Sequence, residues 1–69
     1  MTFGDNLKRA RIEKGLTQKQ VAEKSGMAET QYQGYENNRR VPNVLIAAKL
    51  ASVIGCTLDS LVLGINHNV

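Results

Sequence analysis

Basic side chains gather in the first part of the chain, where they could bind a polyanion through ion pairs. Of the 69 residues, nine are Lys or Arg and six are Asp or Glu, which gives a net charge of +3. Residues 1–42 hold eight of the basic and five of the acidic side chains, whereas residues 43–69 hold only Lys49 and Asp59. This division predicts one surface that faces a polyanion and a second, apolar surface for packing or assembly. A solvated charged face explains the charge alone equally well.

Few residues could carry out covalent or metal chemistry. Asp59, Ser60 and His67 are the residue types of a hydrolase triad. Ser60, however, falls in the first turn of an expected helix, His67 lies near the chain end, and no oxyanion-hole motif accompanies them. Cys56 is the single cysteine, and together with one histidine it falls short of the four ligands of a structural zinc site. We therefore expect no enzyme activity, no metal and no cofactor.

The length of the chain limits the fold to one small domain, which we expect to cover residues 1–69. A domain of this size buries only about 60% of the surface that its unfolded chain exposes, so a deep catalytic cavity is not expected. No run approaches the ~20 apolar residues of a membrane span, and the first residues lack the order of a secretion signal. The sequence thus predicts a cytoplasmic protein with no membrane partner.

Helix signals recur five times, and no segment alternates as a strand does. The expected helices cover about residues 3–14, 17–25, 28–37, 44–54 and 58–62. The expected N-caps are Thr2, Thr17, Asn43 and Thr57, and the expected stops are Gly15, Gly26 and Gly55. The tail, residues 64–69, has no periodicity. The sequence therefore predicts an all-α fold, a compact bundle of five short helices.

The second and third expected helices are joined by a turn centred on Gly26. The third displays polar side chains around Tyr32 and Tyr35, whose i, i+3 spacing predicts that they pack on the core. A loop over residues 37–42 follows, in which Asn38 is suited to the left-handed conformation. Two short helices arranged in this way are what a helix-turn-helix requires.

Three segments carry a resemblance to a known family. They are Gly15 to Met27, Tyr35-Glu36-Asn37-Asn38 with the following Pro42, and Ile54 to Leu61. In this order the sequence resembles the Cro and phage-repressor type (XRE type) of helix-turn-helix regulators over residues 3–63. The resemblance implies a lambda-repressor-like domain, with the helix-turn-helix at about residues 17–37. It also implies a transcriptional regulator that binds double-stranded DNA.

By that resemblance the third helix enters the major groove. The residues expected to read bases are Glu29, Thr30, Gln31, Gln33 and Gly34. The residues expected to hold phosphates are Gln18, Lys19, Asn37, Arg39 and Arg40, with the minor groove as an alternative for either arginine. Each of these polar residues could instead be part of a solvated face. Arg11 and Glu36 match a family pair that locks the first and third helices together.

Three positions in the third helix depart from the family pattern. Ala28 stands where a capping Ser, Thr or Asn is usual, and Gly34 lies inside the helix; each costs about 1 kcal/mol. Glu29 has the wrong sign for a neighbour of phosphates. Because no arginine lies on this helix, the sequence predicts that specificity depends on Gln, Thr and DNA shape more than on guanine pairing.

The end of the chain holds more apolar residues than a short helix needs to cover its own core. The residues expected at a dimer interface are Leu61, Val62, Leu63 and Ile65. They could instead close the end of the bundle. We expect a homodimeric repressor that reads an inverted repeat. The alternative is a protein-interaction module that keeps the fold and binds another regulator with only weak DNA binding.

Overall fold

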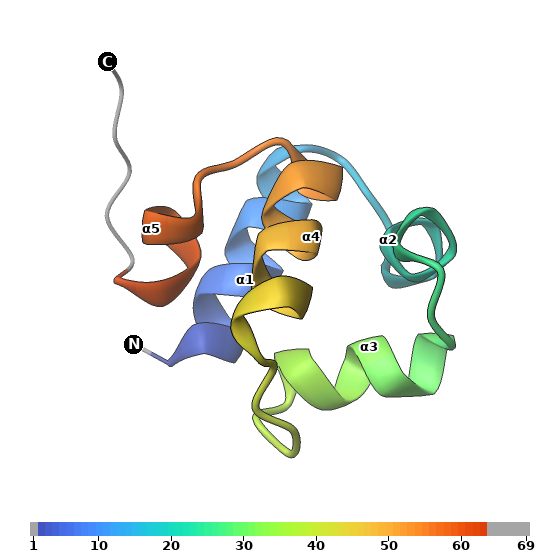
Figure 1. Cartoon of the computed structure of the whole chain (residues 1–69). Helices are drawn as coiled ribbons and strands as arrows, with labels where there is room; N and C mark the ends of the chain where they lie inside the picture. Colours follow the sequence, from blue (N-terminus) through green and yellow to red (C-terminus); the bar gives the residue numbers. More distant parts are fainter. Residues whose placement is uncertain (1, 64–69) are drawn as a thin grey trace.

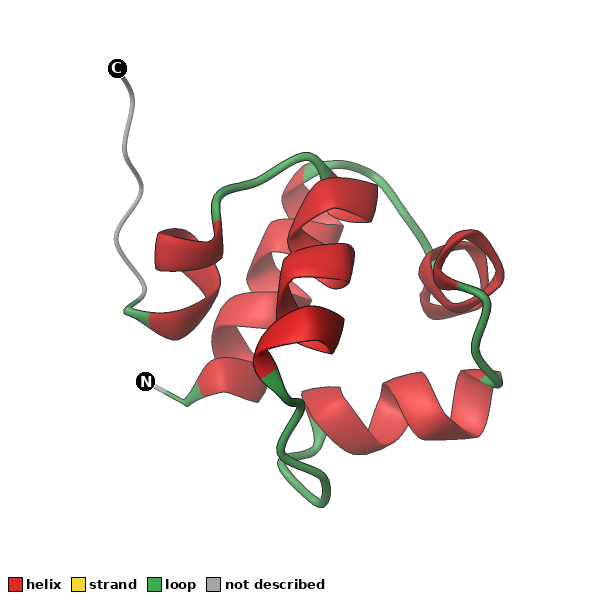
Figure 2. Cartoon of the chain, in the orientation of Figure 1, coloured by secondary structure: helices red, strands yellow, loops and turns green. Residues whose placement is uncertain are grey.

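The computed structural model describes residues 2–63 and contains five α-helices (Figures 1 and 2). They are α1 (Phe3–Glu13), α2 (Gln18–Ser25), α3 (Glu29–Glu36), α4 (Val44–Ile54) and α5 (Leu58–Val62). No strand occurs among the described residues. The all-α fold and its five helices are therefore confirmed. None of these helices has the length and apolar character needed to cross a membrane, within the described residues.

The helix ends follow local capping chemistry. The side chains of Thr2, Thr17, Asn43 and Thr57 each accept a hydrogen bond from the backbone N–H three residues later. Thr17 also forms a capping box with Gln20, whose side chain accepts from the Thr17 N–H. α3 has no such cap, because Ala28 offers no side-chain acceptor. The first and third helices are slightly shorter than expected, since Lys14, Ala28 and Asn37 are caps outside the helices.

The core lies between all five helices, with α5 closing it against α1 and α4 (Figure 1). Its buried members are Leu7, Val21, Ala22, Tyr32, Tyr35, Leu50, Ala51, Ile54 and Leu61. Tyr32 and Tyr35 face inward as the i, i+3 spacing predicts. α3 packs chiefly against α1 and α2, so its remaining face is free to carry polar side chains.

Leu61 is a member of this core and is not exposed at all. The expectation that it lies at a dimer interface is therefore wrong. The reason is tertiary: α5 folds back onto α1, where the buried side chain of Asn6 donates to the Leu61 carbonyl at 2.9 Å. Val62 and Leu63 are 55% and 63% exposed, and Ile65 lies outside the described residues.

The start of α1 lies against the end of α3. A Cβ on Gly4 would overlap the backbone carbonyl of Glu36, so this contact requires glycine. Asn38, whose φ is +61° as the sequence predicts, reaches across to accept from the Gly4 N–H at 3.1 Å and to donate to Thr2 Oγ1 at 3.0 Å. The loop after α3 is thus fixed to the first turn of α1.

Candidate nucleic-acid interface

The outer face of α3 carries a line of polar residues. Thr30, Gln33 and Asn37 follow at i, i+3 and i+7, so they share one face of the helix. Together with Gly34, Arg39 and Arg40 they line a shallow polar hollow. Glu29 and Thr30 are exposed at the beginning of the helix, and residues 37–40 are exposed beyond its end. Because the opposite face of α3 buries both tyrosines, this polar face points to solvent.

A buried network fixes α3 to α1 and α2. Arg11 Nε lies 2.6 Å from Glu36 Oε2, and the two side chains are only 12% and 2% exposed. The expected pairing of Arg11 with Glu36 is therefore present. Tyr32 Oη donates to Glu36 Oε2 at 2.5 Å, and Gln18 Nε2 donates to Glu36 Oε1 at 3.0 Å. Every oxygen of this carboxylate is thus hydrogen-bonded, as a buried charge requires.

This network shifts the titration of its members. Burial alone would raise the pKa of the Glu36 carboxyl, but hydrogen bonds from Arg11, Tyr32 and Gln18 outweigh it and hold that pKa below its usual value. The hydrogen bond to Glu36 raises the pKa of Arg11. Burial, followed by the bond to the Glu36 carboxylate, raises the pKa of the Tyr32 hydroxyl far above its ordinary value. At neutral pH the pair is therefore charged and the phenol is neutral.

Gln18 is turned toward the protein rather than outward. Its amide nitrogen donates to Glu36, and its amide oxygen accepts from Gln33 Nε2 at 3.3 Å. In the described structure this side chain does not point outward, and its expected contact with a phosphate stays a prediction. Instead, the side chain ties the beginning of α2 to the middle of α3 and fixes the position of Gln33.

Three of the five expected base-reading residues do not present a fully free side chain. Gln31 is half-buried and donates to Tyr35 Oη at 3.2 Å. Gly34 is buried, because the side chain of Arg40 lies over it. Gly34 therefore cannot meet a base directly. Gln33 is half-buried and donates one amide N–H to Gln18, but it still lines the polar hollow. Glu29 and Thr30 are exposed, as are Lys19, Asn37 and Arg39 around them.

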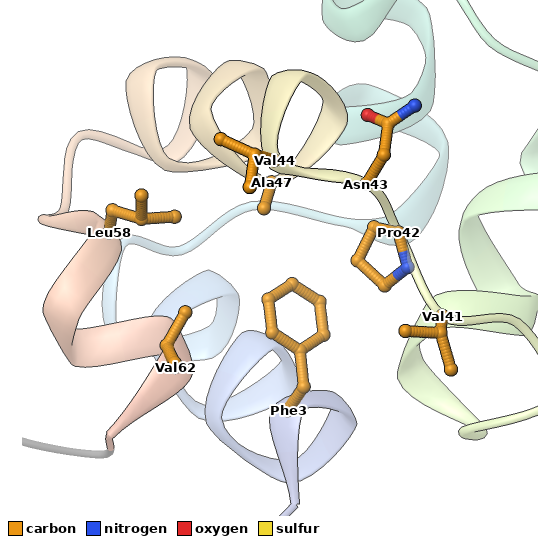
Figure 3. A pocket seen from close by; sticks show the side chains of 8 residues that line it. All are labelled: Phe3, Val41, Pro42, Asn43, Val44, Ala47, Leu58 and Val62. Atoms are coloured by element: carbon orange, nitrogen blue, oxygen red, sulfur yellow. The ribbon is translucent and has the colours of Figure 1, made fainter.

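An apolar groove lies on another part of the surface (Figure 3). Phe3 points into its centre, between Pro42, Leu58 and Val62. The groove is lined by Phe3, Val41, Pro42, Asn43, Val44, Ala47, Leu58 and Val62. Val44 shares the apolar helical spacing of Ala47 and Leu50, yet it is 72% exposed where it lines this groove. Val41 and Leu45, which sequence reasoning missed, are 93% and 80% exposed.

Two short helices joined by a tight turn, with the second anchored on its inner side and polar outside, define a helix-turn-helix domain. Residues 7–61 match the family described as "Helix-turn-helix". The chain therefore belongs to the helix-turn-helix family, which is a family of transcriptional regulators and not of enzymes.

Several relatives are similar in sequence. Over 62 residues the chain is 34% identical to the uncharacterized HTH-type transcriptional regulator YqaE of Bacillus subtilis, covering 90% of this chain and 53% of YqaE. It is 39% identical over 59 residues to the uncharacterized HTH-type transcriptional regulator y4dJ of Sinorhizobium fredii, covering 86% of this chain and 77% of y4dJ. The chain thus spans only about half the length of YqaE.

Solved structures share the fold. The restriction-modification controller protein C.AhdI of Aeromonas hydrophila superposes with a TM-score of 0.81 at 30% identity, covering 86% of this chain and 89% of C.AhdI. SinR, a master regulator for biofilm formation solved in complex with DNA, superposes with a TM-score of 0.80 at 28% identity, covering 87% of this chain and 97% of SinR. The P22 c2 repressor superposes with a TM-score of 0.85 at 18% identity, covering 94% of this chain and 98% of the repressor. At this low identity the similarity shows the fold alone.

Proposed function

We propose that this protein is a sequence-specific regulator that binds double-stranded DNA through α3, as a homodimeric repressor on an inverted repeat. The observation that carries the proposal is the polar outer face of α3, which is backed by a rigid buried network. An eight-residue helix is about 12 Å long, and the major groove admits a helix of ordinary width. SinR, to which this chain is similar, was solved in complex with DNA, which supports DNA binding by this domain as well.

The accessible side chains suit base recognition. Gln33 can form two hydrogen bonds with adenine, Thr30 can contact a thymine methyl group, and Glu29 can accept from the cytosine amino group. Gln18 acts as a positioning residue here, because its bond to Gln33 fixes the reach of that amide. Lys19, at the beginning of α2, would meet a phosphate.

Beyond the end of α3, Asn37 and Arg39 are exposed where the flanking backbone of the duplex would lie, so we assign phosphate contacts to both.

The apolar groove supports assembly into a dimer. A monomer that inserts one short helix would bind weakly, whereas a second copy makes the second docking event intramolecular. Val62 and Leu63 continue the groove into an exposed apolar surface. To read an inverted repeat, the dimer must hold its two α3 helices about 34 Å apart on one side of the duplex.

The same groove also favours a second candidate function. A partner regulator rather than a second copy could cover the exposed Val41, Val44 and Leu45. Glu29, which is exposed at the beginning of α3, would oppose phosphates and favours this reading as well. In that case the domain would bind duplex DNA weakly even in about 50 mM salt.

The experiment that tests the proposal is the selection of bound duplexes from a random pool, followed by affinity measurements. We expect a palindromic consensus. Thr30→Ala should relax the preference at one base pair and cost about 1 kcal/mol on the preferred site, the value of one lost apolar contact. Thr30 is exposed, so the substitution should leave the helical content unchanged. Ser52→Ala, at an exposed position on α4, is the control and should change neither property.

The salt dependence of binding tests the backbone contacts. Arg39→Ala should weaken binding to all sequences about equally and should lower the slope of log affinity against log salt concentration by about one. Equal losses on every sequence for Thr30→Ala and Arg39→Ala would contradict the division into base-reading and phosphate-binding residues. A pool from which no duplex is enriched would favour the protein-interaction module.

A further inference from the structure

Arg40 occupies the space that a side chain at position 34 would fill. A Cβ built on Gly34 would lie 3.0 Å from Cδ, 3.2 Å from Cγ and 3.4 Å from Nε of Arg40. The arginine stem therefore runs across the bare position of α3, one turn after Thr30 on the same face of the helix. Both residues line the polar hollow of the outer face.

The backbone fixes this placement. The N–H groups of Arg39 and Arg40 both donate to the Gly34 carbonyl, at 2.9 and 3.2 Å, and the Asn38 N–H donates to the Tyr35 carbonyl at 3.4 Å. With Asn38 in the left-handed conformation, these bonds form a Schellman turn that folds the chain back along α3. Asn38 is itself held by the beginning of α1. The start of the Arg40 side chain is therefore as well fixed as a position on the helix.

The guanidinium of Arg40 has its donors available. Among residues 2–63, no hydrogen bond or ion pair engages it, whereas each guanidinium nitrogen of Arg11 donates to a group inside the protein. A planar guanidinium offers two parallel N–H donors, the geometry that matches the O6 and N7 acceptors of guanine. A phosphate would also accept these donors but would carry no sequence information.

We propose that Arg40 is a specificity-determining residue that reads a guanine in the major groove from the place left vacant by Gly34. This inference rests on the proposed function and deepens it. It also revises the expectation that specificity makes little use of guanine because α3 carries no arginine. An arginine from the following loop takes the position that a side chain of the helix would otherwise hold.

The test uses the full chain and a duplex site selected from a random pool. Each guanine of that site is replaced in turn by 7-deazaguanine, which lacks the N7 acceptor. We expect one replacement to lower the affinity of the wild type about tenfold and to leave the affinity of Arg40→Ala unchanged. Arg40→Lys should keep less of this sensitivity than the wild type, because an ammonium group lacks the planar two-donor fork. Arg39→Ala is the matched control and should keep the wild-type sensitivity to that replacement.

A second variant tests the role of the vacant position. Gly34→Gln places a side chain where Arg40 lies and removes a helix-interior glycine, so helical content should be retained. We expect this variant to bind duplex DNA with the guanine preference lost, although Arg40 is still present. If Gly34→Gln keeps the guanine preference, Arg40 does not need the space over Gly34 to reach the base, which contradicts the proposal.

The outcomes separate this proposal from the proposed function. If the wild type selects no duplex from the pool, the proposed function and the role of Arg40 are both contradicted. If it binds a defined site, but that site contains no guanine or Arg40→Ala lowers affinity equally on all sequences, only the base-reading role of Arg40 is overturned. In the latter case Arg40 is a phosphate contact.

Discussion

Glu36 receives hydrogen bonds from three different helices or turns of the chain. Arg11 comes from α1, Gln18 from α2 and Tyr32 from one turn earlier in α3. A carboxylate this deeply buried is stable only because these donors replace water. Loss of the carboxylate would leave the Arg11 charge buried without its partner, at a cost of roughly 3 to 5 kcal/mol. The same residue therefore holds α3 in place against α1 and α2, with its polar face outward.

The shifts at Glu36 and Tyr32 predict a stability window in pH. Because the Glu36 pKa is lowered in the fold, the unfolded state takes up protons first as the pH falls below the ordinary value of 4.5, and the free energy of unfolding decreases. Because the Tyr32 pKa is raised, the unfolded state loses its proton first above the ordinary value of 10.0, and the free energy of unfolding decreases again. Thermal melts followed by circular dichroism across this range measure both effects.

Tyr32→Phe distinguishes the loss of stability in acid from the loss of stability in alkali. The variant keeps the ring and the ion pair between Arg11 and Glu36, so stability should still fall in acid. Above pH 10 its free energy of unfolding should decrease less than that of the wild type, since the buried hydroxyl is gone. An equally steep decrease in the variant and the wild type would show that the Tyr32 hydroxyl does not cause it.

At the scale of elements, α3 is the least well capped of the helices with eight or more residues. α1, α2 and α4 each begin with a side-chain cap, whereas Ala28 supplies none. Gly34 lowers the intrinsic helix propensity further. α3 therefore depends on its packing and on the Glu36 network rather than on its own sequence.

Ala28→Ser should stabilise the domain. Ala28 already has the extended backbone of an N-cap, with φ −67° and ψ 147°, so a hydroxyl there can accept from a free N–H of the first turn. We expect a gain of about 1 kcal/mol in the free energy of unfolding, measured by urea titration. Thr17→Ala is the reciprocal control and should lose about as much, because it removes an existing cap. If Ala28→Ser does not change the midpoint of the urea titration, the free N–H groups at the beginning of α3 gain nothing from a side-chain cap.

In the whole molecule, two separate surfaces differ in chemical character. The outer face of α3 is polar, whereas the groove between the beginnings of α1 and α4 and the end of α5 is apolar (Figures 1 and 3). An exposed apolar surface of this kind marks an interaction site. The separation of the two surfaces allows a dimer to form without covering α3.

Val62→Glu should disrupt the dimer. A carboxylate in the groove of each copy would be buried against apolar side chains, so we expect a monomer by sedimentation at concentrations where the wild type is dimeric. Affinity for the palindromic site should fall by about 100-fold, because the second docking event is no longer intramolecular. Ile12→Glu is a matched control, since Ile12 is 56% exposed against 55% for Val62 but does not line the groove. A wild type that stays monomeric at all concentrations would contradict the dimer.

The sequence by itself determined the helices and their ends, because caps and turns act over three or four residues. Thr17 with Gln20, Asn38 in its left-handed turn and the glycine stops could all be recognised from local spacing. The family motif also predicted the pair of Arg11 and Glu36. These features depend on contacts between neighbours in the chain or on a pattern that the motif already contains.

Only the tertiary structure decided which apolar and polar side chains remain free. Leu61 is buried and Val44 is exposed, although both fit an apolar helical stripe, because burial depends on which helix packs against that stripe. Gln18 turns inward because Glu36 and Gln33 lie within reach, and Arg40 covers Gly34 because the chain folds back after α3. Such contacts join residues brought together by packing, so helical periodicity alone does not predict them.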